Sequence, residues 1–184
     1  MTRKAKTPRA EADGIPVHCA FDELVDPVSL VPNPRNPNKH PDEQIRLLAK
    51  IIKAQGWRAP ITVSNRSGFV VRGHARLAAA FALGVDLVPV DRQNYATEAE
   101  EWADLVADNR IAELAEKDNA VLKDVLQELD TGAIDMELTG FTEPAIERLM
   151  TQFYVPDEEP EYDESVADEV KTVVCPKCGR EFPV

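Results

Sequence analysis

The sequence predicts an α+β fold: a compact domain with a small mixed sheet flanked by helices, then a helical segment, then a disordered acidic tail with a cysteine knuckle. Three observations support this prediction. Short runs of β-favouring residues at 60–64, 69–72 and 87–90 alternate with helical patterns. Residues 155–170 contain eight acidic side chains and no basic one, a composition typical of unfolded chain. A CPKCG motif follows this acidic run.

Size and composition set the domain organisation. With 184 residues and 43% apolar content, the chain can bury one core of ordinary size. No apolar run approaches the roughly 20 residues that span a bilayer, and three cysteines make no disulfide framework, so we expect a cytoplasmic protein without a membrane partner. The expected parts are a disordered basic arm (1–14), the α+β domain (15–116), a helical extension (117–154), an acidic linker (155–171) and the knuckle (172–184).

The net charge of −12 argues against a nucleic-acid partner only at first sight. Removing the eight acidic charges of residues 155–170 from this total leaves −4 for the rest of the chain. The first nine residues are basic, with Arg3, Lys4, Lys6 and Arg9. Charge therefore does not exclude DNA.

The first third of the chain predicts a strand, a stiff loop and a helix. Residues 28–31 have strand character, and VPNPRNPNKHP then places four prolines and three asparagines in eleven residues. Such a segment is an extended surface loop, on which Arg35 and His40 are held. A helix follows from Pro41 to Gly56, because proline and acids favour the first turn and glycine ends a helix.

The middle of the chain predicts an anion-binding corner. Residues 60–64 and 69–72 are expected to form a hairpin, and Gly73 then leads into a helix over 74–83. The first N–H groups of a helix lack internal partners and lie at its positive end. Gly73, His74 and Arg76 therefore mark a phosphate site. A further strand at 87–90 contains Pro89, which favours an edge strand or a bulged one.

The helix predicted over 97–116 carries a polar residue on its apolar stripe. Trp102, Leu105, Val106 and Ala112 form the stripe at helical spacing, and Asn109 falls within it. Asn109 is either satisfied by local backbone or turned toward a ligand. The neighbouring Asp108 and Arg110 favour the ligand, since a carboxylate, an amide and a guanidinium can hold Mg²⁺ and phosphate oxygens.

Two helices are expected at 119–129 and 142–153, with Thr142 as N-cap of the second. The long connector and the scarcity of basic residues favour packing helices over a DNA-reading helix-turn-helix. Beyond them, Cys175 and Cys178 have the spacing of zinc ligands, although a structural site needs four. Cys19 and His18, a cysteine pair from a second chain, or no metal at all remain open.

Several motifs in order resemble a known family. The segments PNPRNPNKH, PITV, FVVRGHARLAAAFALGVDLVPV and ADNRIAEL resemble the N-terminal domain of the ParB and sulfiredoxin superfamily, and most closely the ParB-like proteins of phages and prophages. In chromosome-partition ParB proteins, the box GERRxRA binds the phosphates of CTP. Here that box retains Gly73 and Arg76, while His74, Ala75 and Ala78 replace its acid and two arginines.

The resemblance extends to a second box and to the loop. The family box ENxQR is matched by Asp108, Asn109 and Arg110 with one residue fewer, which implies a role with Mg²⁺ and phosphate. The proline-rich loop is implied to bring Arg35 and His40 to the nucleotide. Sulfiredoxin has its catalytic cysteine after the glycine, where this chain has His74, so sulfiredoxin activity is not expected.

These features favour a DNA-associated protein that binds CTP or ATP with Mg²⁺. If the protein is an enzyme, it is a weak nucleoside triphosphatase in which His74 positions water. The alternative is a non-enzymatic adaptor whose partner is a DNA methyltransferase, a terminase or a second copy of the chain. A nuclease is the least favoured function, because the sequence lacks a carboxylate cluster suited to two-metal cleavage.

Overall fold

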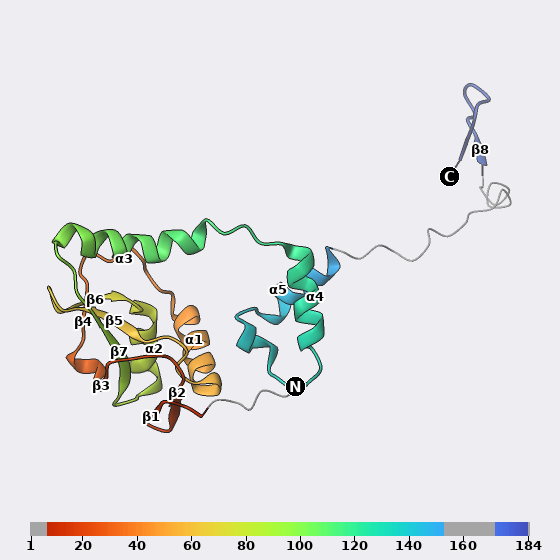
Figure 1. Ribbon diagram of the computed structural model, residues 1–184. Helices are drawn as coiled ribbons and strands as arrows, with labels where there is room; N and C mark the ends of the chain where they lie inside the picture. Colours follow the sequence, from red (N-terminus) through yellow and green to blue (C-terminus); the bar gives the residue numbers. More distant parts are fainter. Residues whose placement is uncertain (1–6, 153–171, 184) are drawn as a thin grey trace. The chain divides into compact units, whose positions relative to one another are not determined.

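The computed structural model describes residues 7–152 and 172–183, which fall into two compact units, Met1–Leu149 and Met150–Val184. The first unit is organised around a mixed five-stranded sheet of order β3-β7-β5-β6-β4 (Figure 1). Two neighbouring pairs, β5 with β7 and β4 with β6, run parallel, and the others run antiparallel. The strands are β3 (Glu23–Val25), β4 (Val31–Pro32), β5 (Ile61–Ser64), β6 (Phe69–Arg72) and β7 (Val88–Gln93). The α+β prediction is confirmed.

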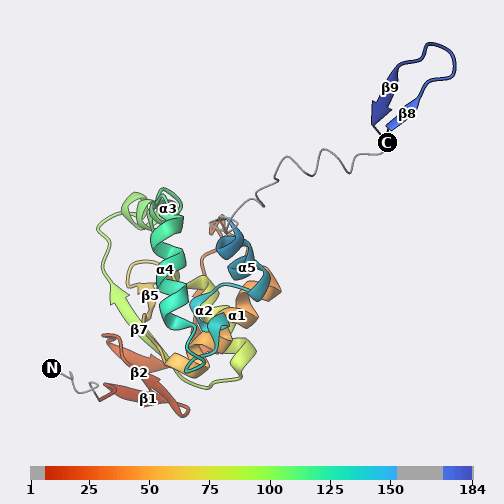
Figure 2. The same ribbon diagram turned by 90° about the vertical axis from the view of Figure 1, so that its right-hand side faces the viewer.

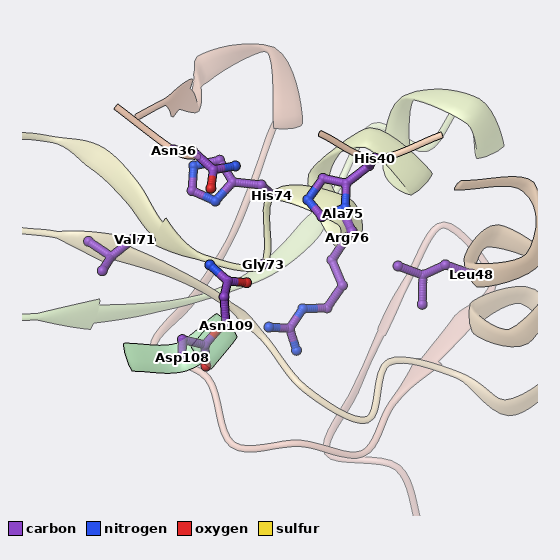
Figure 3. A pocket seen from close by; sticks show the side chains of 10 residues that line it. All are labelled: Asn36, His40, Leu48, Val71, Gly73, His74, Ala75, Arg76, Asp108 and Asn109. Atoms are coloured by element: carbon purple, nitrogen blue, oxygen red, sulfur yellow. The ribbon is translucent and has the colours of Figure 1, made fainter. Parts of the chain in front are cut away.

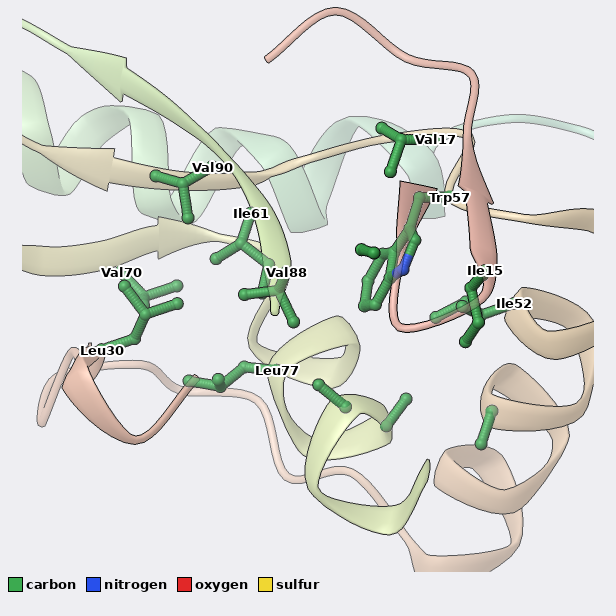
Figure 4. Close-up of a cluster of buried hydrophobic side chains, with 14 of the residues drawn as sticks. Ile15, Val17, Leu30, Ile52, Trp57, Ile61, Val70, Leu77, Val88 and Val90 are labelled. Carbon is green, nitrogen blue, oxygen red and sulfur yellow. The ribbon is translucent and has the colours of Figure 1, made fainter. Parts of the chain in front are cut away.

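Helices cover both faces of this sheet. On one face, α1 (Asp42–Gln55) and α2 (His74–Leu83) pack against each other, as Figure 2 shows. The core between them and the sheet includes Ile52, Trp57 and Leu77 (Figure 4). On the other face lies α3 (Glu98–Glu113), so β5 is buried along its whole length. Because successive side chains of a strand alternate between faces, Ile61 and Val63 enter the core, and Ser64 meets α3.

The N-terminal segment forms a hairpin. Strands β1 (Ala10–Ala12) and β2 (Ile15–Val17) pair antiparallel through a turn at Asp13-Gly14, where both residues have positive φ. An Asp-Gly pair is favoured in two-residue hairpin turns. The prediction of a disordered arm over residues 1–14 is therefore wrong for residues 10–14. Ala12 and Val17 are buried, which ties this hairpin to the core; residues 1–6 lie outside the described part of the chain.

Two other local predictions need correction. The strand expected at 28–31 is a 3₁₀ turn, η1 (Pro27–Ser29), followed by β4, because Asp26 Oδ1 accepts a hydrogen bond of 2.8 Å from the Val28 N–H and caps the turn. The strand containing Pro89 lies inside the sheet, between β3 and β5, and not at its edge. Its register with β5 begins at Val90, one residue after the proline, so the missing N–H precedes that ladder. On the other side Pro89 lies opposite Leu24 of β3, and neither pairing has a bulge.

The helical segment that follows α3 comprises α4 (Asn119–Leu129), η2 (Met136–Thr139) and α5 (Glu143–Thr151). It is anchored on α1. Lys50 forms ion pairs with Asp135, at 2.6 Å, and with Glu137, and the Gln55 amide donates to the Leu138 carbonyl at 3.3 Å. These contacts hold η2 against the first unit's core domain.

The apolar stripe expected on α3 is only partly correct. Leu105 is 1% exposed, but Val106 is 53% exposed and Ala112 is exposed as well. The second buried residue of α3 is Glu101, which the stripe did not include. Helix α3 therefore meets the sheet through a polar contact that helical periodicity could not reveal.

The second unit contains an antiparallel hairpin of β8 (Thr172–Val174) and β9 (Glu181–Pro183), which carries the cysteine motif. The acidic linker predicted at 155–171 lies outside the described residues. Among the helices described, none combines the length and apolar character that crossing a membrane requires.

Candidate phosphate-binding site

A pocket of about 280 Å³ opens where β6 ends and α2 begins. The start of α2 forms its floor, and the proline-rich loop, α1 and α3 supply its walls (Figure 3). Ten residues line it: Asn36, His40, Leu48, Val71, Gly73, His74, Ala75, Arg76, Asp108 and Asn109. The predicted anion corner thus coincides with a pocket.

Gly73 shapes the floor of this pocket. It is the N-cap of α2 and has φ 91°, a left-handed conformation that favours glycine. A Cβ at this position would lie 2.9 Å from Arg76 Nε, so only glycine lets the Arg76 side chain fold back against the start of its own helix. The first internal bond of α2 runs from the Leu77 N–H to the Gly73 carbonyl at 3.0 Å. The N–H groups before Leu77 therefore remain for a ligand.

Arg76 brings a positive charge into the pocket. Its guanidinium points toward Asp108 and Asn109 in Figure 3. Burial lowers the pKa of Arg76, and the nearby Asp108 acts in the opposite direction. Within residues 7–152 and 172–183, Arg76 has no hydrogen bond and no ion pair. A partly buried cation without a carboxylate at bonding distance is a binding group for an anion.

His74 is held as a neutral hydrogen-bond donor. Its Nε2 accepts a hydrogen bond of 3.2 Å from the Asn33 N–H, so the proton of the neutral ring is on Nδ1. Burial lowers the pKa of His74, His40 lowers it further, and Asp108 opposes both. The imidazole therefore offers an N–H to a ligand, and its acceptor nitrogen is already in use.

Asp108 and Asn109 form the wall opposite the α2 N-terminus. The Asn109 amide nitrogen donates to the Leu105 carbonyl at 3.1 Å, which leaves the amide oxygen for the pocket. Asn109 can therefore bond to local backbone and still face a ligand, so the two alternatives for this residue are compatible. Asp108 is exposed, and its carboxylate lies 3.9 Å from Arg72 Nε. These two side-chain oxygens are donors of the kind that Mg²⁺ takes.

Two predicted residues lie elsewhere. The Arg35 guanidinium stacks on the Trp102 ring, 4.1 Å from its centroid, and Arg110 pairs with Glu113 at 2.9 Å. Neither lines the pocket, whereas His40 does. Sequence reasoning missed Asn36, which reaches the pocket because Asn33 Oδ1 accepts from the Arg35 N–H and folds the loop. Its only signal was its place in the proline-rich segment.

A cluster of carboxylates fixes α3 beside the pocket. The fully buried Glu101 accepts hydrogen bonds from the hydroxyls of Ser64 (2.8 Å) and Ser67 (2.6 Å) and from Arg66 Nε (3.1 Å). Burial alone would raise the pKa of Glu101, but these bonds bring it below its ordinary value. One helical turn later, Asp104 accepts from Arg72 Nε at 3.0 Å and from the Tyr95 hydroxyl at 2.7 Å. This arrangement places Asp108 and Asn109 at the pocket.

Comparison with solved structures gives the class of fold. The chain is similar to the C-terminally truncated chromosome-partitioning protein ParB of Caulobacter crescentus complexed with CTP-γ-S, with a TM-score of 0.59 and 18% identity over 73% of this chain and 79% of that one. A second structure of the Caulobacter protein, complexed to the centromeric parS site, gives a TM-score of 0.41 at 18% identity over 74% of each chain. The first likeness shows that the fold is that of ParB.

Sequence comparison identifies the family. The chain is 38% identical over 61 residues to the ParB-like nuclease domain-containing protein YnaK of Escherichia coli K12. The aligned residues make up 33% of this chain and 69% of YnaK. The chain belongs to the family of ParB-like domain proteins.

The helical segment has a match of its own. The family described as ParB-methyltransferase HTH domain matches residues 120–178. The match covers less than half of the chain, and its description differs from the prediction that these helices are packing elements. In the structure, η2 lies in the long connector between α4 and α5.

Proposed function

We propose that this protein is a DNA-associated ParB-like protein whose pocket binds the phosphates of a nucleoside triphosphate, CTP or ATP, together with Mg²⁺. The observation that carries the proposal is the Arg76 guanidinium, which lies in the pocket beside the unpaired N–H groups of α2 and has no anionic partner at bonding distance in the described chain. The similarity to a ParB structure complexed with CTP-γ-S supports the same assignment.

Each lining group has a place in this proposal. Arg76 and the first N–H groups of α2 bind phosphate oxygens, and the His74 Nδ1–H donates to one of them. The Asp108 carboxylate and the Asn109 oxygen suit a Mg²⁺ ion that neutralises the triphosphate. His40 and Asn36 come from the loop and close the pocket over the ligand.

Hydrolysis is the finer part of the proposal. Because the acceptor nitrogen of His74 is bonded to Asn33, His74 suits the positioning of the nucleotide better than the abstraction of a proton from water. The pocket then supports only slow turnover. Phosphate release measured for wild type and His74→Gln tests this: equal, slow rates are expected, and a large loss in the variant would support the predicted role of His74 in positioning water.

Isothermal titration tests the binding proposal. Wild-type protein is titrated with CTP, ATP and their non-hydrolysable analogues, with and without Mg²⁺. Arg76→Ala is expected to raise the Kd at least tenfold, or about 1.4 kcal/mol, without loss of thermal stability. Arg110→Ala is the matched control, because Arg110 is paired outside the pocket. Absence of binding by folded wild-type protein, or equal losses in both variants, would refute the pocket.

A second function, that of an adaptor, is favoured by the acidic charge of the C-terminal part of the chain. Residues 119–151 contain seven acidic and only two basic residues, and residues 155–170 add eight acidic and no basic residues. Binding to the DNA backbone depends on neutralising phosphates with lysine and arginine, so this segment suits a protein partner better than DNA. On the second proposal, the partner is a DNA methyltransferase, a class that the name of the matching family includes.

The adaptor proposal is tested by pull-down and gel shift. Removal of residues 155–184 should abolish capture of the methyltransferase and leave nucleotide binding unchanged. Arg76→Ala should have the reverse effect. A nuclease, the third alternative, is tested by incubating plasmid DNA with the protein and Mg²⁺ or Mn²⁺, and cleavage that Asp108→Ala removes would establish it.

A further inference from the structure

The cysteine hairpin of the second unit has the geometry of half a metal site. Strand β8 pairs with β9, with Val173 opposite Phe182 and Val174 opposite Glu181. The turn between them is closed by two hydrogen bonds of 2.9 Å, from the Cys175 N–H to the Arg180 carbonyl and from the Gly179 N–H to the Cys175 carbonyl. Both cysteines of CPKC therefore lie on one rigid turn.

Cys175 and Cys178 stand three positions apart on this turn. This is the C-x₂-C spacing of zinc ligands, and thiolates are the form of cysteine that binds zinc.

The two valines of β8 are largely exposed. Val173 is 57% exposed and Val174 is 54% exposed. An isolated two-stranded hairpin is at best marginally stable in water, and units of this size generally depend on a disulfide, a metal or association. A tetrahedral zinc ion would supply the missing cross-link, but it needs four ligands.

We infer that Cys175 and Cys178 bind zinc together with the same two cysteines of a second copy of this chain, so that one Zn²⁺ joins two hairpins in a dimer. A twofold axis through the metal makes the two pairs equivalent. Each of the four thiols loses its proton as its Zn–S bond forms, and the Zn²⁺(Cys⁻)₄ centre carries a net charge of 2−. Lys177 and Arg180, on the same turn as the ligands, offset that charge.

Within the described part of the second unit, Cys175 and Cys178 are the only cysteines. The remaining cysteine, Cys19, is partly buried and packs against the core of the first unit, where burial raises the pKa of its thiol. Among residues 7–152 and 172–183, no group of three or more His, Cys, Asp or Glu side chains gathers in a way that could hold a metal ion. A second copy brings an identical pair of thiolates.

The experiment combines metal analysis with a mass measurement on the full chain. Purified protein is expected to contain one zinc per two chains, and light scattering should give the dimer mass, which falls to the monomer mass when a chelator removes the metal. Co²⁺ substitution should give the visible bands of tetrahedral thiolate coordination. The double variant Cys175→Ser, Cys178→Ser should lose zinc, bands and dimer, whereas the control Cys19→Ser should keep all three.

Three results would overturn the inference. Metal-free wild-type protein, prepared with zinc present, would show a hairpin that needs no metal. One zinc per monomeric chain would show that the ligands come from a single chain. A dimer that persists in the double serine variant would separate association from the cysteines. None of these results bears on the nucleotide pocket, which lies in the first unit.

Discussion

Three arginines in the segment from β5 to α2 have different surroundings. Arg66 and Arg72, which follow β5 and end β6, each donate to a carboxylate of α3: Glu101 for Arg66 and Asp104 for Arg72. Arg76, one turn into α2, has no such partner within the described residues and lies in the pocket. The first two arginines hold α3 on the sheet, and the third is left for a ligand.

The comparison shows how one helix produces both situations. Two carboxylates of α3 are spaced three residues apart: Glu101 reaches the turn that follows β5, and Asp104 reaches the end of β6. The next turn of the helix places Asp108 and Asn109 at the pocket. Beside Arg76, the Asp108 carboxylate is near but not at bonding distance, and Asn109 presents an amide. The N-terminal half of α3 thus acts as a clamp that holds the helix on the sheet, and the next part of α3 forms a wall of the pocket.

Breaking the clamp should have the largest effect. Glu101→Ala removes a buried carboxylate and leaves the hydroxyls of Ser64 and Ser67 without their acceptor. We expect a loss of about 2–4 kcal/mol in the free energy of unfolding, measured by urea denaturation. Glu98→Ala is the matched control: Glu98 lies 3.9 Å from Arg66 but is exposed, and should cost less than about 0.5 kcal/mol. Equal losses would show that Glu101 is no clamp.

Converting the binding wall into a clamp tests the comparison from the other side. Asn109→Asp gives Arg76 the carboxylate that Arg66 and Arg72 already have, and it repels phosphate. Nucleotide affinity should fall at least tenfold, about 1.4 kcal/mol, while the melting temperature stays the same or rises. Asn94→Asp adds the same charge outside the pocket and should leave affinity unchanged. Unimpaired binding in Asn109→Asp would remove Arg76 from the site.

The Tyr95 hydroxyl gives a smaller, separable contribution to the clamp. It donates to Asp104 at 2.7 Å, and burial and this carboxylate together raise the pKa of Tyr95. Tyr95→Phe should reduce the free energy of unfolding by about 1 kcal/mol. In an Asp104→Ala background the same change should cost close to nothing, because the acceptor is gone. An undiminished cost in that background would place the effect in packing.

The pH dependence should separate clamp from pocket with the smallest effects. Burial favours protonation of Glu101 and Asp104, but their hydrogen bonds outweigh it and leave both pKa values lowered. Their stabilisation is therefore present above the unfolded pKa values of about 4 and is lost as the pH falls through the folded values. The pKa of His74 is also lowered, mainly by burial. As the pH falls, the unfolded chain therefore binds a proton at His74 before the folded chain does. The free energy of unfolding decreases once the pH drops below about 6.5.

Urea unfolding from pH 8 to pH 3 measures both branches. His74→Gln should remove the loss that begins near pH 6.5 and keep the acid branch, whereas Glu101→Gln should reduce the acid branch alone. Identical profiles for wild type and His74→Gln would show that His74 does not titrate between the folded and unfolded states.

The predictions from sequence succeeded where the chemistry is local. Helix α2, its glycine caps and the hairpin before it were predicted because φ preferences and free N–H groups depend on neighbours in the chain. The same reasoning found Gly73, His74 and Arg76. The Asp13-Gly14 turn carried an equally local signal, and the basic residues around it caused the hairpin to be missed.

The sequence by itself determined the α+β class, the Gly73 corner and the polar character of Asp108 and Asn109. Only the tertiary structure decided which charges pair. Glu101 is more than thirty residues from Ser64, Ser67 and Arg66. Helical periodicity therefore cannot reveal that the fold buries this acidic side chain and bonds it to all three. Arg35 stacks on Trp102 and Arg110 pairs with Glu113, so neither lies in the predicted site, whereas Arg76 has no such partner among the described residues. Long side chains pair according to distances in space, which their spacing along the chain does not fix.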